Sequence, residues 1–270
     1  MNDKTRQGRP VSDQRKAGKP PTNLHITHQD ERAGNEWIKT FSHNDPFSEN
    51  VVLEARGDQF NAGLLQVVQD ADRKQILLTE NFRQPITLTA IKHEESKAFL
   101  LRTIDELDIS HIYVSSLRGH SLDVLEMPVP TTIAHHDFFP FCIARTAVFG
   151  SPCETCGAQE LTQCVYGNLA VKNPVRVRYW LQLRDHFFGL LAKRNVAYIV
   201  NSDQIEERLL RLDVRFAKMA FHVVPRACQM TEVVEAIYAV RGDEVALATR
   251  WLGYLRQSTS ETARSSSELV

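Results

Sequence analysis

Val129-Pro-Thr-Thr-Ile-Ala-His-His-Asp-Phe-Phe-Pro-Phe-Cys142 is the stretch that decides the fold. Its apolar first half predicts a strand over residues 131–134, and the polar residues His135, His136 and Asp137 follow directly where that strand ends. Parallel α/β sheets bind their ligands at the carboxyl ends of the strands. The stretch therefore predicts a buried parallel strand that ends in a polar cleft.

A second stretch, Ile112-Tyr-Val-Ser-Ser-Leu-Arg-Gly-His-Ser-Leu-Asp-Val-Leu125, has the same pattern further upstream. A strand over residues 109–115 is expected to end in a turn containing Gly119, His120 and Ser121, before a short helix. Glycine permits a tight turn, and the N-terminus of the helix exposes N–H groups that favour anions. Two interpretations stay open, because the turn either contacts a ligand or is a capped βα turn with a solvated His120.

Hydrophobic periodicity predicts the remaining elements. Strands are expected near residues 51–53, 64–68, 75–79, 86–91, 196–200 and 218–224, and helices near 94–107, 121–126, 175–193 and 203–211. The short strand–helix–strand spacing over residues 109–134 implies a parallel βαβ unit with a right-handed crossover. The chain is therefore predicted to be an α/β protein, with a Rossmann-like parallel sheet flanked by helices and a small antiparallel or mixed part formed by the early strands.

Composition divides the chain into four parts. Residues 1–49 are predicted to be a mostly disordered tail, because residues 1–23 are polar and basic and cannot bury a core. Residues 50–227 form the predicted α/β domain. A helical segment is expected over 228–257, and a polar, serine-rich disordered tail over 258–270.

Bulk properties narrow the function. The 270 residues are 43% hydrophobic and 24% charged, as in an ordinary globular protein, and the net charge of -1 predicts no nucleic-acid partner. No apolar run approaches the ~20 residues that span a bilayer, and the polar start of the chain is unlike a signal peptide. A cytoplasmic protein is expected, with peripheral contact at the inner face of the membrane left open. The glycine-rich nucleotide-binding signatures are absent.

Together the two stretches resemble the N-terminal domain of family 4-like glycosyltransferases, enzymes of the GT-B type with two Rossmann domains. In that family, Ser-Leu-x-Gly-His-Ser-Leu precedes Pro-Thr-x-x-x-x-His-Asp-Phe/Tyr, and a strand–helix junction follows. The junction here reads Val196-Ala-Tyr-Ile-Val-Asn-Ser-Asp-Gln-Ile-Glu-Glu-Arg-Leu209, with Asn201 where proline is usual. The resemblance covers residues 60–225. It implies the acceptor-side half of an enzyme of polysaccharide or glycoconjugate biosynthesis, which transfers a sugar from a nucleotide sugar to a glycan or lipid-linked acceptor.

The resemblance also implies roles for individual residues. His136 and Asp137 are the expected catalytic residues, with the imidazole near the donor sugar and Asp137 either orienting that ring or capping the next element. The expected substrate-binding residues are Gly119, His120, Ser121 and Ser202. The structural alternatives are that His135 or His136 merely caps strand carbonyls and that Ser202 is a helix N-cap.

The sequence departs from the family after Phe221-His-Val-Val-Pro225. The family continues with His-Gly or Asn-Gly, whereas this chain has Arg226-Ala-Cys228 and then too few residues for a second domain of ~150 residues. We therefore expect the donor-binding half to be missing, the isolated chain to be inactive, and a separate donor-binding chain to be a candidate partner. The alternative function is a non-catalytic glycan-binding or scaffolding module.

Four of the five cysteines cluster within 23 residues. They are Cys142, Cys153, Cys156 and Cys164, and the middle pair has the C-x-x-C spacing that lets two thiolates share one zinc ion. A Cys₄ zinc site would be structural, because four thiolates leave no open position for a substrate. A redox-sensitive or disulfide pair and ordinary reduced cysteines are the alternatives.

Overall fold

The computed structural model describes residues 19–57, 63–171, 175–194, 196–219 and 221–224. The main sheet contains β1 (Thr22–His28), β2 (Glu49–Arg56), β3 (Leu65–Asp70), β4 (Ile76–Asn81), β5 (Ile109–Val114), β6 (Thr131–Ala134), β9 (Ala197–Val200) and β10 (Phe221–Val223). The helices are α1 (Arg32–Asn44), α2 (Glu94–Glu106), α3 (Ala158–Gly167), α4 (Val177–Arg194) and α5 (Asp203–Leu212), with short 3₁₀-helices η1 (Leu122–Glu126) and η2 (Val214–Lys218). A small separate hairpin joins β7 (Val148–Phe149) and β8 (Ser151–Pro152).

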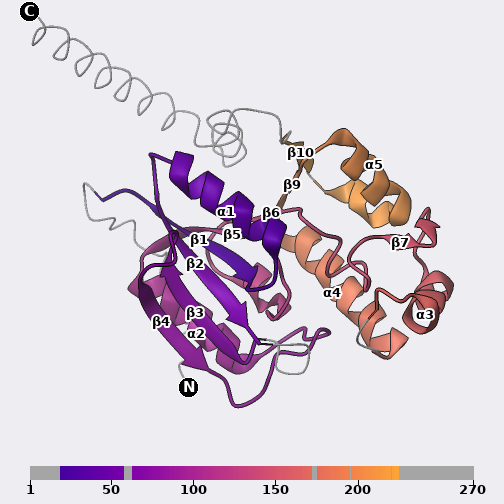
Figure 1. The fold of residues 1–270 in the computed structure, drawn as a ribbon, viewed down its shortest axis with the longest axis horizontal. Coiled ribbons are helices and arrows are strands. Elements are labelled where there is room, and N and C mark those ends of the chain that lie inside the picture. The colour runs from indigo at the N-terminus through magenta and orange to yellow at the C-terminus, as the bar shows by residue number, and fades with distance from the viewer. Residues whose placement is uncertain (1–18, 58–62, 172–174, 195, 220, 225–270) are drawn as a thin grey trace, which may run out of the picture.

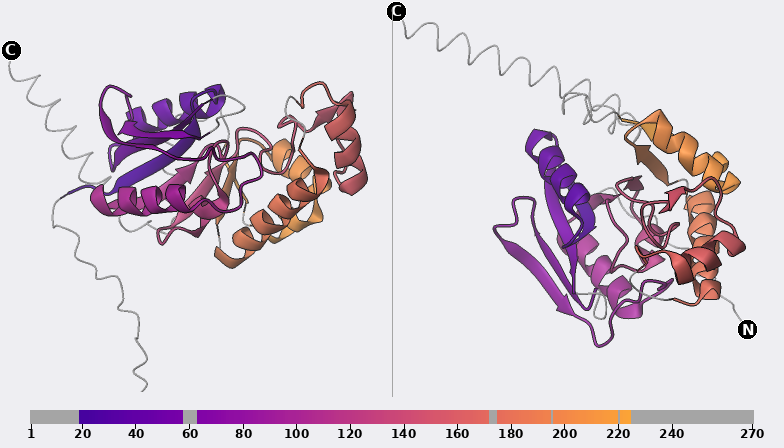
Figure 2. Two further views of the ribbon diagram at one scale, coloured as in Figure 1. Left: turned by 90° about the horizontal axis from the view of Figure 1, so that it is seen from below. Right: turned by 45° about the vertical axis from the view of Figure 1, so that its right-hand side comes forward.

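The strands of the main sheet lie in the order β10-β9-β6-β5-β1-β2-β3-β4. All neighbours from β10 to β2 pair in parallel, and β3 and β4 complete one edge in antiparallel pairing. Helices α1 and α2 lie on opposite faces of the sheet (Figure 2). Helix α4 packs against η1, and α3 lies beyond α4 at the end of the molecule far from β4 (Figure 1). The predicted Rossmann-like α/β fold with a mostly parallel sheet is confirmed.

The central strand β1 was not predicted. All seven of its residues are buried, and Leu24 and Ile26 are completely inaccessible to solvent. The prediction that residues 1–49 form a disordered tail is therefore wrong for β1 and α1. Polar residues stand among the apolar ones in β1, so the sequence pattern does not indicate a buried strand. The His25 ring has a polar partner, because it hydrogen-bonds the Asn50 side chain at 2.9 Å. Such partners make polar residues compatible with a buried strand.

Smaller differences concern the connections. The predicted strand over residues 86–91 is a turn region, although Ile86 in it is buried, and the predicted helix over residues 121–126 is the 3₁₀-helix η1. Helix α3 was not predicted. The predicted helix over 228–257 and the tail over 258–270 lie outside the described residues. Among the helices that the structure describes, none is long and apolar enough to cross a membrane.

Replacing Ile26 by alanine tests whether β1 belongs to the core. Because the Ile26 side chain is fully buried, we expect Ile26→Ala to lower the free energy of unfolding by ~2–5 kcal/mol. Leu169→Ala is the matched control, since Leu169 is 98% exposed and its loss should change stability little. Urea unfolding of the full-length chain measures both changes. Equal stabilities of the two variants would contradict the central position of β1.

Candidate functional site

The order of the strands reverses at the centre of the sheet. From β1 the chain crosses to β2 on one side, and it later returns to place β5 on the other side of β1. In open α/β sheets, a crevice forms at the carboxyl ends of the strands where the strand order reverses. The segments that leave β1, β5 and β6 meet at this edge, and their side chains form the candidate site.

One arginine joins two acidic side chains there. The Arg145 Nη1 lies 3.1 Å from Glu31 Oε2 and 3.4 Å from Asp137 Oδ2. Glu31 precedes α1 and Asp137 follows β6, so Arg145 connects segments far apart in sequence. Burial, and then the nearby Glu31, raise the pKa of Asp137 to about 7, and burial also raises the pKa of Glu31. Asp137 can therefore exchange a proton near neutral pH.

Arg145 also lines a neighbouring cavity of about 340 Å³. Its polar walls are Asp30, Arg118 and Arg145, and its apolar walls include Phe139 and Trp180. Arg118 Nη2 lies 3.4 Å from Asp30 Oδ2. Guanidinium groups bind phosphate and carboxylate well, and carboxylates accept hydrogen bonds from hydroxyl groups. The cavity is suited to a small polar ligand that carries both anionic and hydroxyl groups.

His136, a predicted catalytic residue, lies beside this cavity rather than on its wall. Its ring centroid is 5.5 Å from that of Trp37 on α1. A Cβ atom on Gly34 would approach His136 Cδ2 to 3.5 Å and Ser115 Cβ to 3.1 Å, so the first turn of α1 fits closely over the strand ends. The half-buried His136 is thus covered by α1.

Asp137 takes a capping position as well as its ion pair. Its Oδ1 accepts a hydrogen bond from the backbone N–H of Phe139 at 2.9 Å, and its side chain is 15% exposed. The sequence left open whether Asp137 orients the imidazole or caps the next element, and the hydrogen bond to Phe139 corresponds to the second interpretation. The contact with Arg145 adds an electrostatic role that the sequence did not indicate.

The other two histidines that the sequence places after strand ends, His120 and His135, are buried in the core. His120 Nε2 donates a hydrogen bond to the carbonyl oxygen of Thr27 at 2.8 Å, and burial lowers the pKa of His120 to about 4. His135 Nδ1 lies 3.2 Å from the Tyr198 hydroxyl, and burial together with the charge of His136 lowers the pKa of His135 to about 3. Both rings are therefore neutral at pH 7, and His120 ties the turn after β5 to β1.

The remaining predicted substrate-binding residues also lie off the cavity wall. Gly119 has a φ of 72°, and a Cβ atom there would lie 2.9 Å from Ala55 Cβ, so a side chain would be strained and crowded. Ser121 is buried, and its Oγ donates to Asp123 Oδ2 at 2.8 Å. Ser202 directly precedes α5, but its side chain makes no capping hydrogen bond.

Four charged residues of the site were missed by sequence reasoning: Asp30, Glu31, Arg118 and Arg145. Asp30 and Glu31 follow β1, which lies in the stretch that the composition predicts to be a tail. The signal was present as Leu24-His-Ile-Thr-His28 followed by acidic residues, because an apolar–polar alternation before charged residues is typical of a strand end. Arg118 stands beside Gly119 in the quoted motif, whereas nothing in the sequence marks Arg145.

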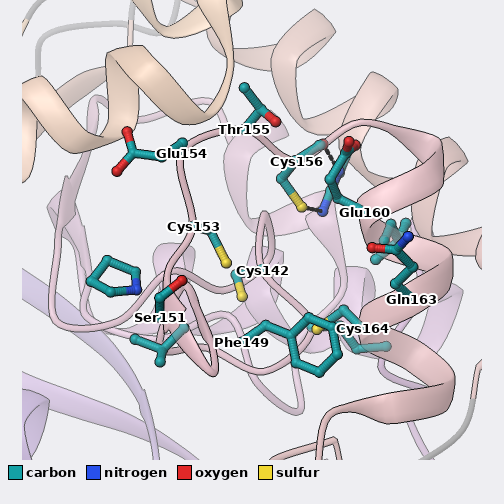
Figure 3. Close-up of a pocket in the computed structure, with 15 residues that line it drawn as sticks. Cys142, Phe149, Ser151, Cys153, Glu154, Thr155, Cys156, Glu160, Gln163 and Cys164 are labelled. Carbon is teal, nitrogen blue, oxygen red and sulfur yellow. Dashed lines mark hydrogen bonds between the residues drawn. The ribbon is translucent and has the colours of Figure 1, made fainter.

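A second cavity, of about 250 Å³, lies between the β7–β8 hairpin and α3 and is lined by all four clustered cysteines (Figure 3). All four are free thiols. Burial raises the pKa of Cys142 to about 11 and also raises the pKa of Cys153 and of Cys164, with the neighbouring Cys156 as a further cause each time. In the part of the chain that the structure describes, no three His, Cys, Asp or Glu side chains are placed to hold a metal ion. The zinc site stays a prediction.

The fold and the site define an α/β protein with a charged crevice at the reversal of its strand order. No family model, no curated protein and no solved structure matches this chain.

The raised pKa of Asp137 makes stability depend on pH. Between the ordinary pKa of 3.8 and about 7, the folded protein keeps a proton on Asp137 that the unfolded chain releases. The stability of the wild type relative to Asp137→Asn should therefore fall as pH rises through this window. Both proteins contain the same histidines, so their contribution cancels. Urea unfolding of the two proteins at several pH values measures the difference, and a difference that is flat or rises with pH would contradict the raised pKa.

Proposed function

We propose that this chain supplies the acceptor-binding part of a glycosyl transfer, in which a sugar moves from a nucleotide-sugar donor to a glycan or lipid-linked acceptor. The observation that carries this proposal is the ion-paired group of Glu31, Arg145 and Asp137, of which Arg145 lines a polar cavity where the strand order reverses. Phosphate-bearing glycans present both an anionic group and several hydroxyls, which are the groups that this cavity is suited to bind.

Each charged residue then has a part in acceptor binding. Arg118 and Arg145 hold the anionic group of the acceptor through charge-assisted hydrogen bonds. Glu31 and Asp137 accept hydrogen bonds from its hydroxyls. As the acceptor hydroxyl attacks the donor sugar it must lose its proton, and a carboxyl group with a pKa of about 7 is well matched to receive that proton near neutral pH. Asp137 is accordingly the proposed general base.

Donor binding is assigned to a partner. Departure of the nucleotide diphosphate builds negative charge that must be stabilised by positive groups or N–H donors. The glycine-rich nucleotide-binding signatures are absent from the sequence. A separate donor-binding chain that closes over the crevice is therefore part of the proposal.

A non-catalytic glycan-binding module is the second candidate. His136 packs against Trp37 instead of lining the cavity, which favours a role without turnover. The two candidates share the acceptor cavity and differ only in the step that follows binding.

Binding and transfer by full-length protein distinguish these candidates. The probes are phosphate- and diphosphate-lipid-linked oligosaccharides with short chains, and native mass spectrometry or calorimetry measures their affinity. We expect Arg145→Ala to weaken binding by at least ~10-fold, about 1.4 kcal/mol, because it removes the charge that faces the anionic group. Arg83→Ala is the control, since the side chain of Arg83 is 93% exposed and lies outside the cavity.

Asp137→Asn separates binding from chemistry. With a donor-binding partner present, this variant should keep the affinity for the acceptor within a few-fold and lose transfer by ~10²–10⁴-fold, as expected for removal of a general base. Binding without transfer by the wild type under the same conditions would favour the non-catalytic module. If the folded wild type binds none of the probes, both candidates are wrong.

A further inference from the structure

The cysteine cavity takes no part in the proposed function. Its four cysteines come from three places: the loop after β6, the segment that follows β8, and α3. Figure 3 shows the four side chains around one space between these segments. Arg184 of α4 also lines this cavity. Four thiols from separate segments therefore line one cavity, which suggests that they share one ligand.

A buried cation stands next to the thiols. Arg184 is only 1% exposed, and its charge is one of the causes that lower the pKa of Asp213. Its Nη2 donates to the Cys156 Sγ at 3.0 Å, and its other nitrogens donate to the carbonyl oxygens of Phe141 and Cys156 at 2.7 and 2.8 Å. Arg184 therefore places a charged N–H donor directly on one of the four sulfurs.

A second sulfur also receives a hydrogen bond. Asn168 Nδ2 donates to Cys164 Sγ at 3.3 Å, and the same amide donates to the carbonyl oxygen of Val148 in β7. N–H donors to sulfur are typical of the groups that surround thiolate ligands and orient them toward a metal. Two of the four sulfurs therefore have such donors in place.

The segment around the cavity has little regular structure. Between β6 and α3 it contains only the two-residue strands β7 and β8, and Arg145 and Ala147 have positive φ angles of 63° and 51°. A long connection of this kind has little helix or sheet pairing to hold it, and metal coordination is an established way to fix such a segment.

From these observations we propose that Cys142, Cys153, Cys156 and Cys164 bind one Zn²⁺ ion as a structural Cys₄ site. Four thiolates prefer zinc in tetrahedral geometry, and the C-x-x-C pair supplies two neighbouring ligands. On binding, each thiol loses its proton to solvent and forms one zinc–sulfur bond, so four protons leave. The resulting site carries two negative charges, one of which Arg184 offsets.

The four sulfurs have to move before they can coordinate one zinc ion. No three of them stand at metal-binding positions in the described conformation. Rotation about the Cα–Cβ bond moves a sulfur between staggered positions while the backbone stays in place, and the flexible side chains of Arg184 and Asn168 must then follow the sulfurs of Cys156 and Cys164. The cavity of about 250 Å³ has room for the ion and for the rotated side chains.

This inference does not rest on the proposed function, but it bears on the same part of the fold. Cys142 is three residues from Arg145, and Ile143 lines both cavities. A zinc ion would hold the segment that carries Arg145 against α3 and α4.

Metal analysis of full-length protein, expressed with added zinc and purified without chelator, tests the proposal. We expect one zinc ion per chain by mass spectrometry of the metals, and loss of nearly all of it in the Cys153→Ser/Cys156→Ser variant. Cys228→Ser is the control, since it replaces the one cysteine outside the 23-residue cluster, and it should keep its zinc. Chelation of the wild type should lower its melting temperature, because metal binding energy is folding energy.

Two measurements on the wild type cover the case in which the variant does not fold. Replacement of zinc by Co²⁺ should give the visible absorption of a tetrahedral thiolate complex. Alkylation should find four of the five thiols protected with zinc bound, and all five reactive in the denatured, chelated protein. Protein without zinc or a cobalt spectrum, zinc retained by the double variant, or a disulfide between any two of the four cysteines would each overturn the proposal.

Discussion

The position of β1 between β2 and β5 is the constraint on which the rest of the structure depends. Because β1 has a parallel partner on each side, the chain must leave it in one direction and return in the other, and this creates the crevice. Burial of all seven residues of β1 also fixes where α1 begins, and hence where Asp30 and Glu31 stand. Neighbouring side chains hydrogen-bond Asn23, His25 and Thr27 inside the strand, which makes these polar residues compatible with its burial.

The charges of the crevice are held by a backbone that is itself under constraint. Arg145 adopts the left-handed conformation, which side chains other than glycine rarely take and which costs ~1–3 kcal/mol. Two backbone hydrogen bonds keep it there: Arg145 N–H donates to the Cys142 carbonyl and Phe138 N–H to the Arg145 carbonyl, both at 3.0 Å. This conformation directs the Arg145 guanidinium toward the carboxyl groups of Glu31 and Asp137, and its positive charge balances part of their negative charge.

The sequence predicted those elements whose burial follows one simple period. Helix α2 and strand β6 match their predicted ranges closely, and the polar edge after β6 is where the site lies. Strand β1 was missed because its polar residues Asn23 and His25 hydrogen-bond Asp45 and Asn50. Partners that far along the chain leave no local sequence pattern. His120 shows the same limit, since only the position of the Thr27 carbonyl distinguishes a core histidine from a ligand contact. Arg145 could not be found at all, because its role comes from a loop conformation.

The arrangement of neighbours in the sheet also has a consequence for how the chain assembles. Strands β2, β3 and β4 follow one another in sequence and pair as an antiparallel meander, so this edge can form from local contacts. Strand β1 gains its second partner only when Ile26 meets Val114, and β6 waits for β9 through the pairing of Ile133 with Tyr198. Such long-range parallel pairing is slow, and a strand with one open edge is prone to pair with another chain in the meantime. In a ribosome-bound chain that ends before β5, the edge of β1 that later pairs with β5 is therefore unpaired. The yield of folded protein then depends on how quickly synthesis passes that point.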